Sequence, residues 1–353
     1  MCGICGEIVF SDAPASATRI ERMSDALAPR GPDGAGLVLR GRVGFGHRRL
    51  KIIDLSDAAA QPFVDTALGL TIAFNGCIYN YPELRAELEA AGHRFASTGD
   101  TEVILKAWAE WGPSCVERFH GMFAFALHER ETGRVALVRD RFGIKPLYLA
   151  EAGGRLRFAS TLPALVAAGD VDTSIDRAAL HHYMTWHAVV PAPRTILTGV
   201  RKLPPATMRV LEPDGQSTDW TWWRPRFDRS PEDAARSPED WRDMTLEALR
   251  TAVRRRMVAD VPVGVLLSGG VDSSLIVGLL AEEGQSGLAT YSIGFEEAYG
   301  EKGDEFVYSD LIAREYGTDH HKIRIPSEEM RENLPHAIAA MSEPMVSYDN
   351  IGF

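Results

Sequence analysis

The sequence begins with MCGICG, which places two of the four cysteines at positions 2 and 5. A C-x-x-C spacing is typical of redox or metal pairs, but no second C-x-x-C or H-x-x-x-H follows that could complete a metal site. The alternative depends on the position of Cys2 directly behind Met1. If Met1 is removed, Cys2 carries its own α-amine, whose ordinary pKa of about 8 suits a base that takes the thiol proton. We interpret Cys2 as a candidate nucleophile, and Cys5 and Cys115 as small buried hydrophobes.

A second stretch whose residues could bind a ligand or take part in a reaction is VLLSGGVDSS at 265–274. An apolar strand runs through two glycines directly into a helix, so backbone N–H groups and the positive end of the helix dipole converge on one point. This arrangement favours a phosphate. The stretch is neither a Walker motif nor G-x-G-x-x-G. The plain alternative is a tight strand-to-helix turn, which glycines also serve.

The elements that must position these residues change in character near residue 210. Before it, runs such as GLTIAFNG, GMFAFALHE and RVALVRD predict antiparallel strands, and three helical patterns at 17–28, 81–92 and 100–112 interrupt them. This mixture indicates an α+β layered domain. After it, Ser237 predicts the N-cap of a helix through Arg256, and strand and helix patterns then alternate as in a parallel α/β sheet.

Length and composition exclude several classes of protein. A chain of 353 residues is long enough for two domains, and 45% hydrophobic with 25% charged residues is typical of a soluble globular protein. A net charge of -11 disfavours nucleic acid as a partner. No apolar run is long enough to span a membrane and no secretory signal is evident, so we expect a cytoplasmic protein.

Several motifs of the first half occur together with the 265–274 loop. They are MCGICG, RGPDG at 30–34, GHRRLKIIDLS at 46–56, FNGCIYNY at 74–81, STGDTEVI at 97–104, HGMFAFAL at 120–127 and RDRFGIKPLY at 139–148. Together they resemble a class II glutamine amidotransferase domain, and the whole chain is similar to the glutamine-dependent asparagine synthetase family. NGCIYNY, WHAVVPAPRTI and SEPMVSYDN are most similar to the N-acetylglutaminylglutamine amidotransferases of that family.

The resemblance implies a fold and a domain plan. An N-terminal nucleophile hydrolase α/β/β/α sandwich is expected over residues 2–211, followed by a connecting segment over 212–237. The N-terminal part of an adenine-nucleotide α-hydrolase-like parallel-sheet domain is expected over 238–353. The chain ends at SYDNIGF, before the family's second glycine-rich acidic loop, so we expect the synthetase half to be truncated.

For the glutaminase site the resemblance implies Cys2 as nucleophile, with Asn75 and Gly76 forming the oxyanion hole. Arg49 would bind the α-carboxylate of glutamine and Asp100 its α-ammonium group, with Cys77 beside them. Taken alone, Arg49 could be a solvated strand-end charge and Asp100 a helix N-cap. Many family members have Glu where Cys77 stands, which removes a side-chain carboxylate there.

For the nucleotide site the resemblance implies that Ser268, Gly269, Gly270, Asp272 and Ser273 hold pyrophosphate. Leu266 and Ile293 would flank adenine through their backbones. Asp272 would also help to hold Mg²⁺, and either Asp304 or Glu305 could be a further acid near the metal.

The expected reaction is therefore glutamine hydrolysis, transfer of ammonia through the interior, and ATP- and Mg²⁺-dependent adenylation of a carboxylate that ammonia attacks. The expected acceptor is N-acetylglutaminylglutamine, whose amide would serve as an osmoprotectant; aspartate, giving asparagine, is the alternative. A phosphosugar amidotransferase is disfavoured by SGGVDSS, and a nonenzymatic regulatory or binding remnant stays open. The resemblance also leaves a homodimer open.

Overall fold

The computed structural model describes residues 1–285, 287–296 and 305–345. The chain divides into two compact units, Met1–Arg226 and Phe227–Phe353, and each is described by itself. Most of the chemistry expected of the first half depends on how two sheets of the first unit face one another.

The first sheet of this unit is six-stranded and antiparallel, in the order β10-β8-β9-β1-β3-β2. Its strands are β1 (Gly3–Val9), β2 (Gly34–Arg40), β3 (Val43–Arg49), β8 (Tyr148–Ala152), β9 (Arg155–Ala159) and β10 (Arg201–Lys202). Helices α1 (Ala17–Ala26) and α4 (Leu162–Ala167) pack on its outer face, where Ile20, Met23 and Leu165 are buried.

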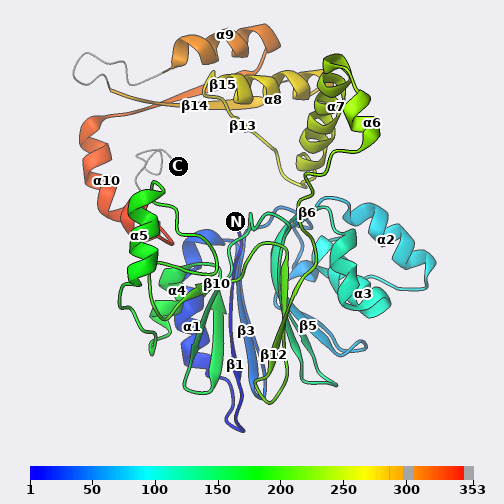
Figure 1. The fold of residues 1–353 in the computed structure, drawn as a ribbon, viewed down its shortest axis with the longest axis vertical. Coiled ribbons are helices and arrows are strands. Elements are labelled where there is room, and N and C mark those ends of the chain that lie inside the picture. Colours follow the sequence, from blue (N-terminus) through cyan, green and yellow to red (C-terminus); the bar gives the residue numbers. More distant parts are fainter. Residues whose placement is uncertain (286, 297–304, 346–353) are drawn as a thin grey trace. The chain divides into compact units, whose positions relative to one another are not determined.

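The second sheet is also six-stranded and antiparallel, in the order β12-β11-β7-β6-β5-β4. Its strands are β4 (Phe63–Asp65), β5 (Leu70–Ile78), β6 (Gly121–Glu129), β7 (Val135–Arg139), β11 (Thr207–Leu211) and β12 (Ser217–Thr221). Helices α2 (Tyr81–Ala90) and α3 (Asp100–Trp111) cover its outer face (Figure 1). The unit is thus a four-layer α/β/β/α sandwich, as the sequence predicts.

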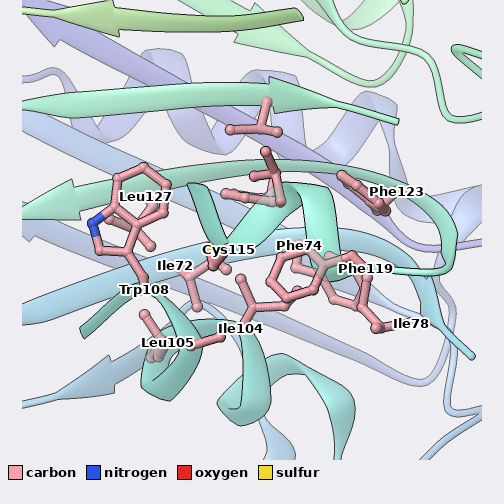
Figure 2. Close-up of a cluster of buried hydrophobic side chains, with 14 of the residues drawn as sticks. Ile72, Phe74, Ile78, Ile104, Leu105, Trp108, Cys115, Phe119, Phe123 and Leu127 are labelled. Carbon is pink, nitrogen blue, oxygen red and sulfur yellow. The ribbon is translucent and has the colours of Figure 1, made fainter. Parts of the chain in front are cut away.

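The outer core of the second sheet shows how the layers are held. Figure 2 shows Ile72, Phe74 and Ile78 of β5 beside Ile104 and Trp108 of α3. These side chains are buried, and α3 presents them at helical spacing because its apolar residues recur every three to four positions. Packing against α3 holds β5 in place, and the opposite face of β5 lies toward the first sheet.

The inner faces of the two sheets form a separate core. Ile4 and Ile8 of β1, Phe45 of β3 and Ala73 of β5 meet there. Side chains alternate between the two faces of a strand. Cys2 therefore falls on the same side as Ile4, and the later positions of β3 and β5 continue these inner rows.

The remaining regular elements of the first unit are short or lie outside the sandwich. They are α5 (Arg177–Thr185) and three 3₁₀ turns, Ala28–Arg30, Asp57–Ala59 and Gly112–Arg118.

The second unit holds a three-stranded parallel sheet in the order β13-β14-β15. Its elements are α6 (Pro231–Ala235), α7 (Pro238–Arg256), β13 (Val265–Leu266), α8 (Val271–Glu282), β14 (Ala289–Phe295), α9 (Phe306–Tyr316), β15 (Asp319–Ile325) and α10 (Ser327–Ala340). Ser237 caps α7 with a reciprocal capping box to Asp240, which agrees with the sequence prediction. The alternation of strands and helices is also as predicted.

The segment 212–237, expected as a connection, contains regular structure. β12 pairs with β11, and Trp222 is buried in the outer core of the second sheet. All five residues of β12 are exposed, so this strand lacks the apolar alternation by which sequence patterns reveal a strand. The boundary between the two units falls between Arg226 and Phe227.

Candidate active site

A cavity of about 260 Å³ in the first unit brings the residues expected at the glutaminase site together. Its lining includes Cys2, Arg49, Asn75, Gly76, Cys77 and Asp100. Cys2 directly precedes β1, and the others come from β3, β5 and α3. Strand alternation explains the convergence, because Cys2, Arg49, Asn75 and Cys77 continue the inner-face rows of their strands. The cavity therefore lies at one end of the space between the sheets.

Cys2 is held at the start of β1 by the backbone of Leu50. The Leu50 N–H donates to Cys2 Sγ at 3.3 Å, and Sγ lies 3.5 Å from the Leu50 carbonyl oxygen. Burial raises the pKa of the Cys2 thiol, whereas the contact with the Leu50 backbone acts in the opposite direction. A thiol of this kind needs a base to take its proton, because the thiolate is the nucleophile.

Asn75 offers an unused donor to the cavity. Only 1% of this residue is exposed, and among the described residues no hydrogen-bond partner faces its side-chain Nδ2. A buried donor without a partner is destabilising unless a ligand supplies an acceptor. The geometry fits an oxyanion hole, in which the donor meets the oxygen of a substrate carbonyl.

Gly76 is required by the close approach of β6. A Cβ at this position would lie 2.3 Å from the carbonyl oxygen of Met122 and 2.7 Å from the Cα of Phe123. The absence of a side chain lets β5 pair with β6 here and leaves the backbone of Gly76 facing the cavity.

Arg49 ends β3 and is fixed by the loop that follows. Its guanidinium donates to the carbonyl oxygen of Ser56 at 2.8 Å and to that of Asp54. Asp54 adopts a left-handed backbone with φ 51°, and its carboxylate accepts the Thr98 N–H at 2.7 Å. The loop is thereby joined to the segment that leads into α3 and Asp100.

Asp100 begins α3 and is buried. Its Oδ2 accepts the Ile78 N–H at 3.0 Å. Burial raises the pKa of Asp100 to about 7, and the hydrogen bond from Ile78 opposes that shift. An ammonium group placed in the cavity would favour the ionised form of this carboxyl group.

Two further residues line the cavity or contact the nucleophile without having been predicted as site residues. Lys145 lines the cavity, and Arg30 Nε donates to the Cys2 carbonyl oxygen at 3.1 Å. The sequence signal was present, because Arg30 lies in RGPDG and Lys145 in RDRFGIKPLY. No periodicity distinguishes them from ordinary surface charges. Cys77 is buried, and burial raises the pKa of its thiol, so it is expected to stay neutral.

In the second unit the predicted phosphate loop connects β13 to α8. Gly269 has φ 85°, and a Cβ there would lie 2.6 Å from the Ser309 nitrogen in α9. The Ser268 hydroxyl lies 3.1 Å from that of Ser273 and accepts the Gly270 N–H at 3.3 Å. Gly270 is the N-cap of α8 and supplies no side-chain cap, so the first N–H groups of α8 are available to a ligand.

The other residues predicted at this site lie close to the loop. Leu266 is in β13, and Ile293 lies in β14 two residues beyond the partner of Leu266. Asp272 is exposed in the first turn of α8. Glu305 is the N-cap of α9, the helix that contacts Gly269, whereas Asp304 lies outside the described residues.

The residues at this loop suit the phosphates of ATP and a bound Mg²⁺ to different degrees. The glycine loop and the open helix N-terminus fit a phosphate group. In the ranges 1–285, 287–296 and 305–345, no group of three or more His, Cys, Asp or Glu side chains could enclose a metal ion. Mg²⁺ commonly uses one or two carboxylates together with phosphate oxygens, so Asp272 fits a metal that arrives with a nucleotide.

Comparison with known families agrees with this division. A family model described as "Glutamine amidotransferase domain" matches residues 1–223, and one described as "Asparagine synthase" matches residues 244–353. The fold and matches define a glutamine amidotransferase domain of the N-terminal nucleophile hydrolase type, joined to an asparagine synthase domain. The chain belongs to the glutamine-dependent asparagine synthetase family.

Several curated relatives align along almost the whole chain. Asparagine synthetase [glutamine-hydrolyzing] 3 of Bacillus subtilis is 32% identical over 98% of this chain and 57% of its own length. Asparagine synthetase [glutamine-hydrolyzing] 1 of the same organism is 35% identical over 98% of this chain and 53% of its own length. Putative asparagine synthetase [glutamine-hydrolyzing] 2 of Methanocaldococcus jannaschii is 32% identical over 99% and 69%. The chain thus spans about half the length of the two Bacillus relatives.

Solved structures support the fold alone. The glutamine phosphoribosylpyrophosphate amidotransferase of B. subtilis, complexed with ADP and GMP, superposes with a TM-score of 0.52 at 17% identity. The match covers 93% of this chain and 91% of that one. No helix within the described parts of the chain combines the length and apolar character needed to cross a bilayer.

Proposed function

We propose that the first unit hydrolyses glutamine to glutamate and ammonia, with Cys2 as nucleophile. The observation that carries the proposal is the cavity in which Cys2 meets the unpartnered Nδ2 of Asn75, the cation of Arg49 and the carboxyl group of Asp100. A thiol, an oxyanion donor and two groups of opposite charge are the functions needed to hold and attack an amino acid side-chain amide.

The proposed reaction starts after removal of Met1. The Cys2 α-amine takes the thiol proton, and Sγ attacks the side-chain carbonyl carbon of glutamine. Asn75 Nδ2 and the Gly76 backbone N–H stabilise the tetrahedral oxyanion. The ammonium group returns the proton to the amide nitrogen, the C–N bond breaks and ammonia leaves, and water then hydrolyses the remaining thioester to glutamate.

Binding of glutamine follows from charge. The planar fork of Arg49 suits the α-carboxylate. Asp100 suits the α-ammonium group, and Cys77 borders the same cavity without adding a charge. A substrate lacking either charged α-group is therefore expected to bind more weakly.

The experiment for this site measures ammonia released from glutamine by the purified chain. Cys2→Ala should abolish release, whereas the control Cys115→Ala, a buried cysteine outside the cavity, should retain it. Intact-mass analysis should show that Met1 has been removed. Full activity in protein that retains Met1 would contradict the α-amine mechanism, and a complete absence of ammonia release would favour a nonenzymatic remnant.

We further propose that the second unit uses ATP to adenylate a carboxylate, which ammonia from the first reaction then attacks. Ser268, Gly269, Gly270 and Ser273 would hold the pyrophosphate, and Asp272 would help to hold Mg²⁺. Leu266 and Ile293 would border the adenine. Support comes from the glycine loop at the open end of α8 and from the asparagine synthase family match.

The adenylation proposal predicts AMP and pyrophosphate as products. The assay uses a version extended to the full length of the relatives and separates nucleotides by chromatography. Asp272→Asn should impair AMP formation and leave glutamine hydrolysis unchanged. Formation of ADP and phosphate would contradict the proposed position of ATP cleavage.

Two carboxylate acceptors are proposed. The motifs WHAVVPAPRTI and SEPMVSYDN favour N-acetylglutaminylglutamine, whereas the names of the relatives favour aspartate. Each acceptor is offered separately with ATP, Mg²⁺ and glutamine, and the product is identified by mass spectrometry. Amidation of aspartate alone would overturn the dipeptide assignment. Light scattering on the same preparation tests whether the chain forms a homodimer.

A further inference from the structure

The loop between β7 and β8 has an inverted exposure pattern. Phe142, whose ring packs edge-on against Trp223, is 69% exposed and Ile144 is 49% exposed, whereas Lys145 is only 3% exposed. Burying a lysine while exposing two large apolar side chains is unfavourable. An arrangement that places the ammonium group in the cavity indicates a role for that charge.

The loop holds Lys145 firmly. The Asp140 carboxylate accepts the backbone N–H groups of Ile144 and Lys145, both at 3.0 Å. Arg139 donates to the carbonyl oxygens of Gly143 at 2.7 Å and Lys145 at 2.8 Å. These bonds fix the backbone on both sides of the lysine and so determine where its side chain starts.

The ammonium group of Lys145 has no carboxylate partner among the described residues. Its Nζ lies 2.9 Å from Met1 Sδ, a residue that the proposed maturation removes. The charged and titratable groups around it are Arg30, the Met1 α-amine, Cys2, Cys77 and Asp140. Burial and Arg30 lower the pKa of Lys145, and the acidic groups oppose that shift.

We propose that Lys145 is a positioning residue that keeps a fixed positive charge beside Cys2, favouring the unprotonated α-amine and the ionised sulfur. The inference rests on the proposed glutaminase function and adds a group to that site. A positive charge makes protonation of a neighbouring amine less favourable and ionisation of a neighbouring thiol more favourable. Both effects extend to lower pH the range in which Cys2 is reactive.

In the structure, which still contains Met1, Lys145 likewise lowers the pKa of the α-ammonium group. Burial lowers the pKa of the Met1 α-ammonium group; Arg30 and Lys145 act in the same direction, whereas Cys2 and Asp33 oppose the shift. Arg30 is anchored to the Cys2 carbonyl oxygen, whereas Lys145 loses its sulfur contact when Met1 is removed. Lys145 therefore loses a direct side-chain contact on maturation.

The test compares mature wild type with Lys145→Met, Lys145→Arg and the control Lys51→Met. Lys51 directly follows Leu50 in the sequence but does not line the cavity, and its ammonium group pairs with the exposed Asp57 at 3.5 Å. For each protein, kcat/KM for glutamine is measured from pH 5.5 to 9. Alkylation of Cys2 by iodoacetamide is followed over the same range by peptide mass spectrometry.

Lys145→Met should move the acid limb of kcat/KM, and the midpoint of Cys2 alkylation, to higher pH by on the order of one unit. Near pH 6.5 this corresponds to a loss of roughly tenfold in kcat/KM. Lys145→Arg should restore most of the shift, and Lys51→Met should show none. Thermal melting of Lys145→Met should match or exceed wild type, because an apolar chain replaces an unpaired buried charge.

An active wild type whose pH profile and alkylation midpoint are unchanged by Lys145→Met would overturn the inference and leave the glutaminase proposal standing. If the wild type released no ammonia, the glutaminase proposal would fail. The alkylation titration would still decide the role of Lys145, because it requires no turnover: an unshifted midpoint overturns that role.

Discussion

Asp54→Ala is expected to weaken glutamine binding although Asp54 does not line the cavity. The Asp54 carboxylate accepts the Thr98 N–H at 2.7 Å and the Ser56 N–H at 3.0 Å. Its carbonyl oxygen accepts from Arg49. Burial alone would raise the pKa of Asp54, but the hydrogen bonds from Ser56 and Thr98 lower it. Asp54 thus joins the loop that fixes Arg49 to the segment that leads into Asp100.

The magnitude follows from the bonds that are lost. A hydrogen bond to a charged group contributes about 1.5–3 kcal/mol, and alanine in a left-handed backbone costs about 1 kcal/mol more. Thr98 is exposed, so water can hydrogen-bond to its N–H and offset part of the loss. We therefore expect Asp54→Ala to destabilise the conformation of the loop that holds Arg49 by about 2 kcal/mol. Since about 1.4 kcal/mol is a factor of ten, KM for glutamine should rise roughly tenfold to thirtyfold while kcat changes by less than about threefold.

The assay is steady-state glutamine hydrolysis with KM and kcat determined separately, together with denaturant unfolding to show that each variant is folded. Asp54→Asn keeps a side-chain oxygen and tolerates the left-handed backbone, so its KM should rise less than that of Asp54→Ala. Asp57→Ala is the matched control, because the Asp57 side chain is 99% exposed. It should leave both constants unchanged.

A KM within twofold of wild type for a folded Asp54→Ala would refute the reasoning, since the link made by Asp54 would then be unnecessary for Arg49. An equal fall in kcat and kcat/KM with unchanged KM would also refute it. That result would place the effect in the transition state rather than in substrate binding.

Gly76→Ala should abolish glutamine hydrolysis and lower stability, because its Cβ would lie 2.3 Å from the Met122 carbonyl oxygen; retained ammonia release with an unchanged melting temperature would contradict this. Since burial raises the pKa of Asp100 to about 7, the free carboxyl group is largely protonated below pH 7, and KM for glutamine should fall as pH rises from 6 to 8. A raised folded-state pKa also means that the contribution of Asp100 to stability is lost as pH rises from about 4 through 7, so Asp100→Asn should flatten the dependence of unfolding free energy on pH. Ser237→Ala should lower the unfolding free energy of the second unit by about 1 kcal/mol through loss of the α7 cap; Ser237→Asp should restore it in the same denaturant titration.

Much of the fold could be predicted because burial imposes periodicity. α3 shows its apolar residues at helical spacing, and β5 to β7 appear as apolar or alternating runs. β12 could not be found in this way, since it is held by backbone pairing to β11 and by the Arg209–Asp219 ion pair rather than by buried apolar side chains. Trp222 shows the same limit, because its burial depends on a sheet formed by distant segments.

Some residues of the candidate site could be predicted from sequence motifs, whereas others were found only from the three-dimensional structure. Cys2, Arg49, Asn75 and Asp100 were identified by family motifs; strand alternation explains why the first three meet, and Asp100 is brought to them at the start of α3. Nothing in their local sequence states that they share one cavity. Arg30 and Lys145 were missed as site residues although their motifs were noticed, because only the three-dimensional arrangement places these charges beside the nucleophile.

The unpartnered Nδ2 of Asn75 also has a consequence for inhibitor discovery. A buried donor that no other group of the described residues engages favours any small molecule that presents a carbonyl oxygen at that point, whether or not it resembles glutamine elsewhere. Screening with carbonyl-bearing fragments should therefore give hits clustered at Asn75. Because Cys2 lines the same cavity, an electrophilic carbon added to such a fragment is expected to convert a reversible binder into a covalent inhibitor.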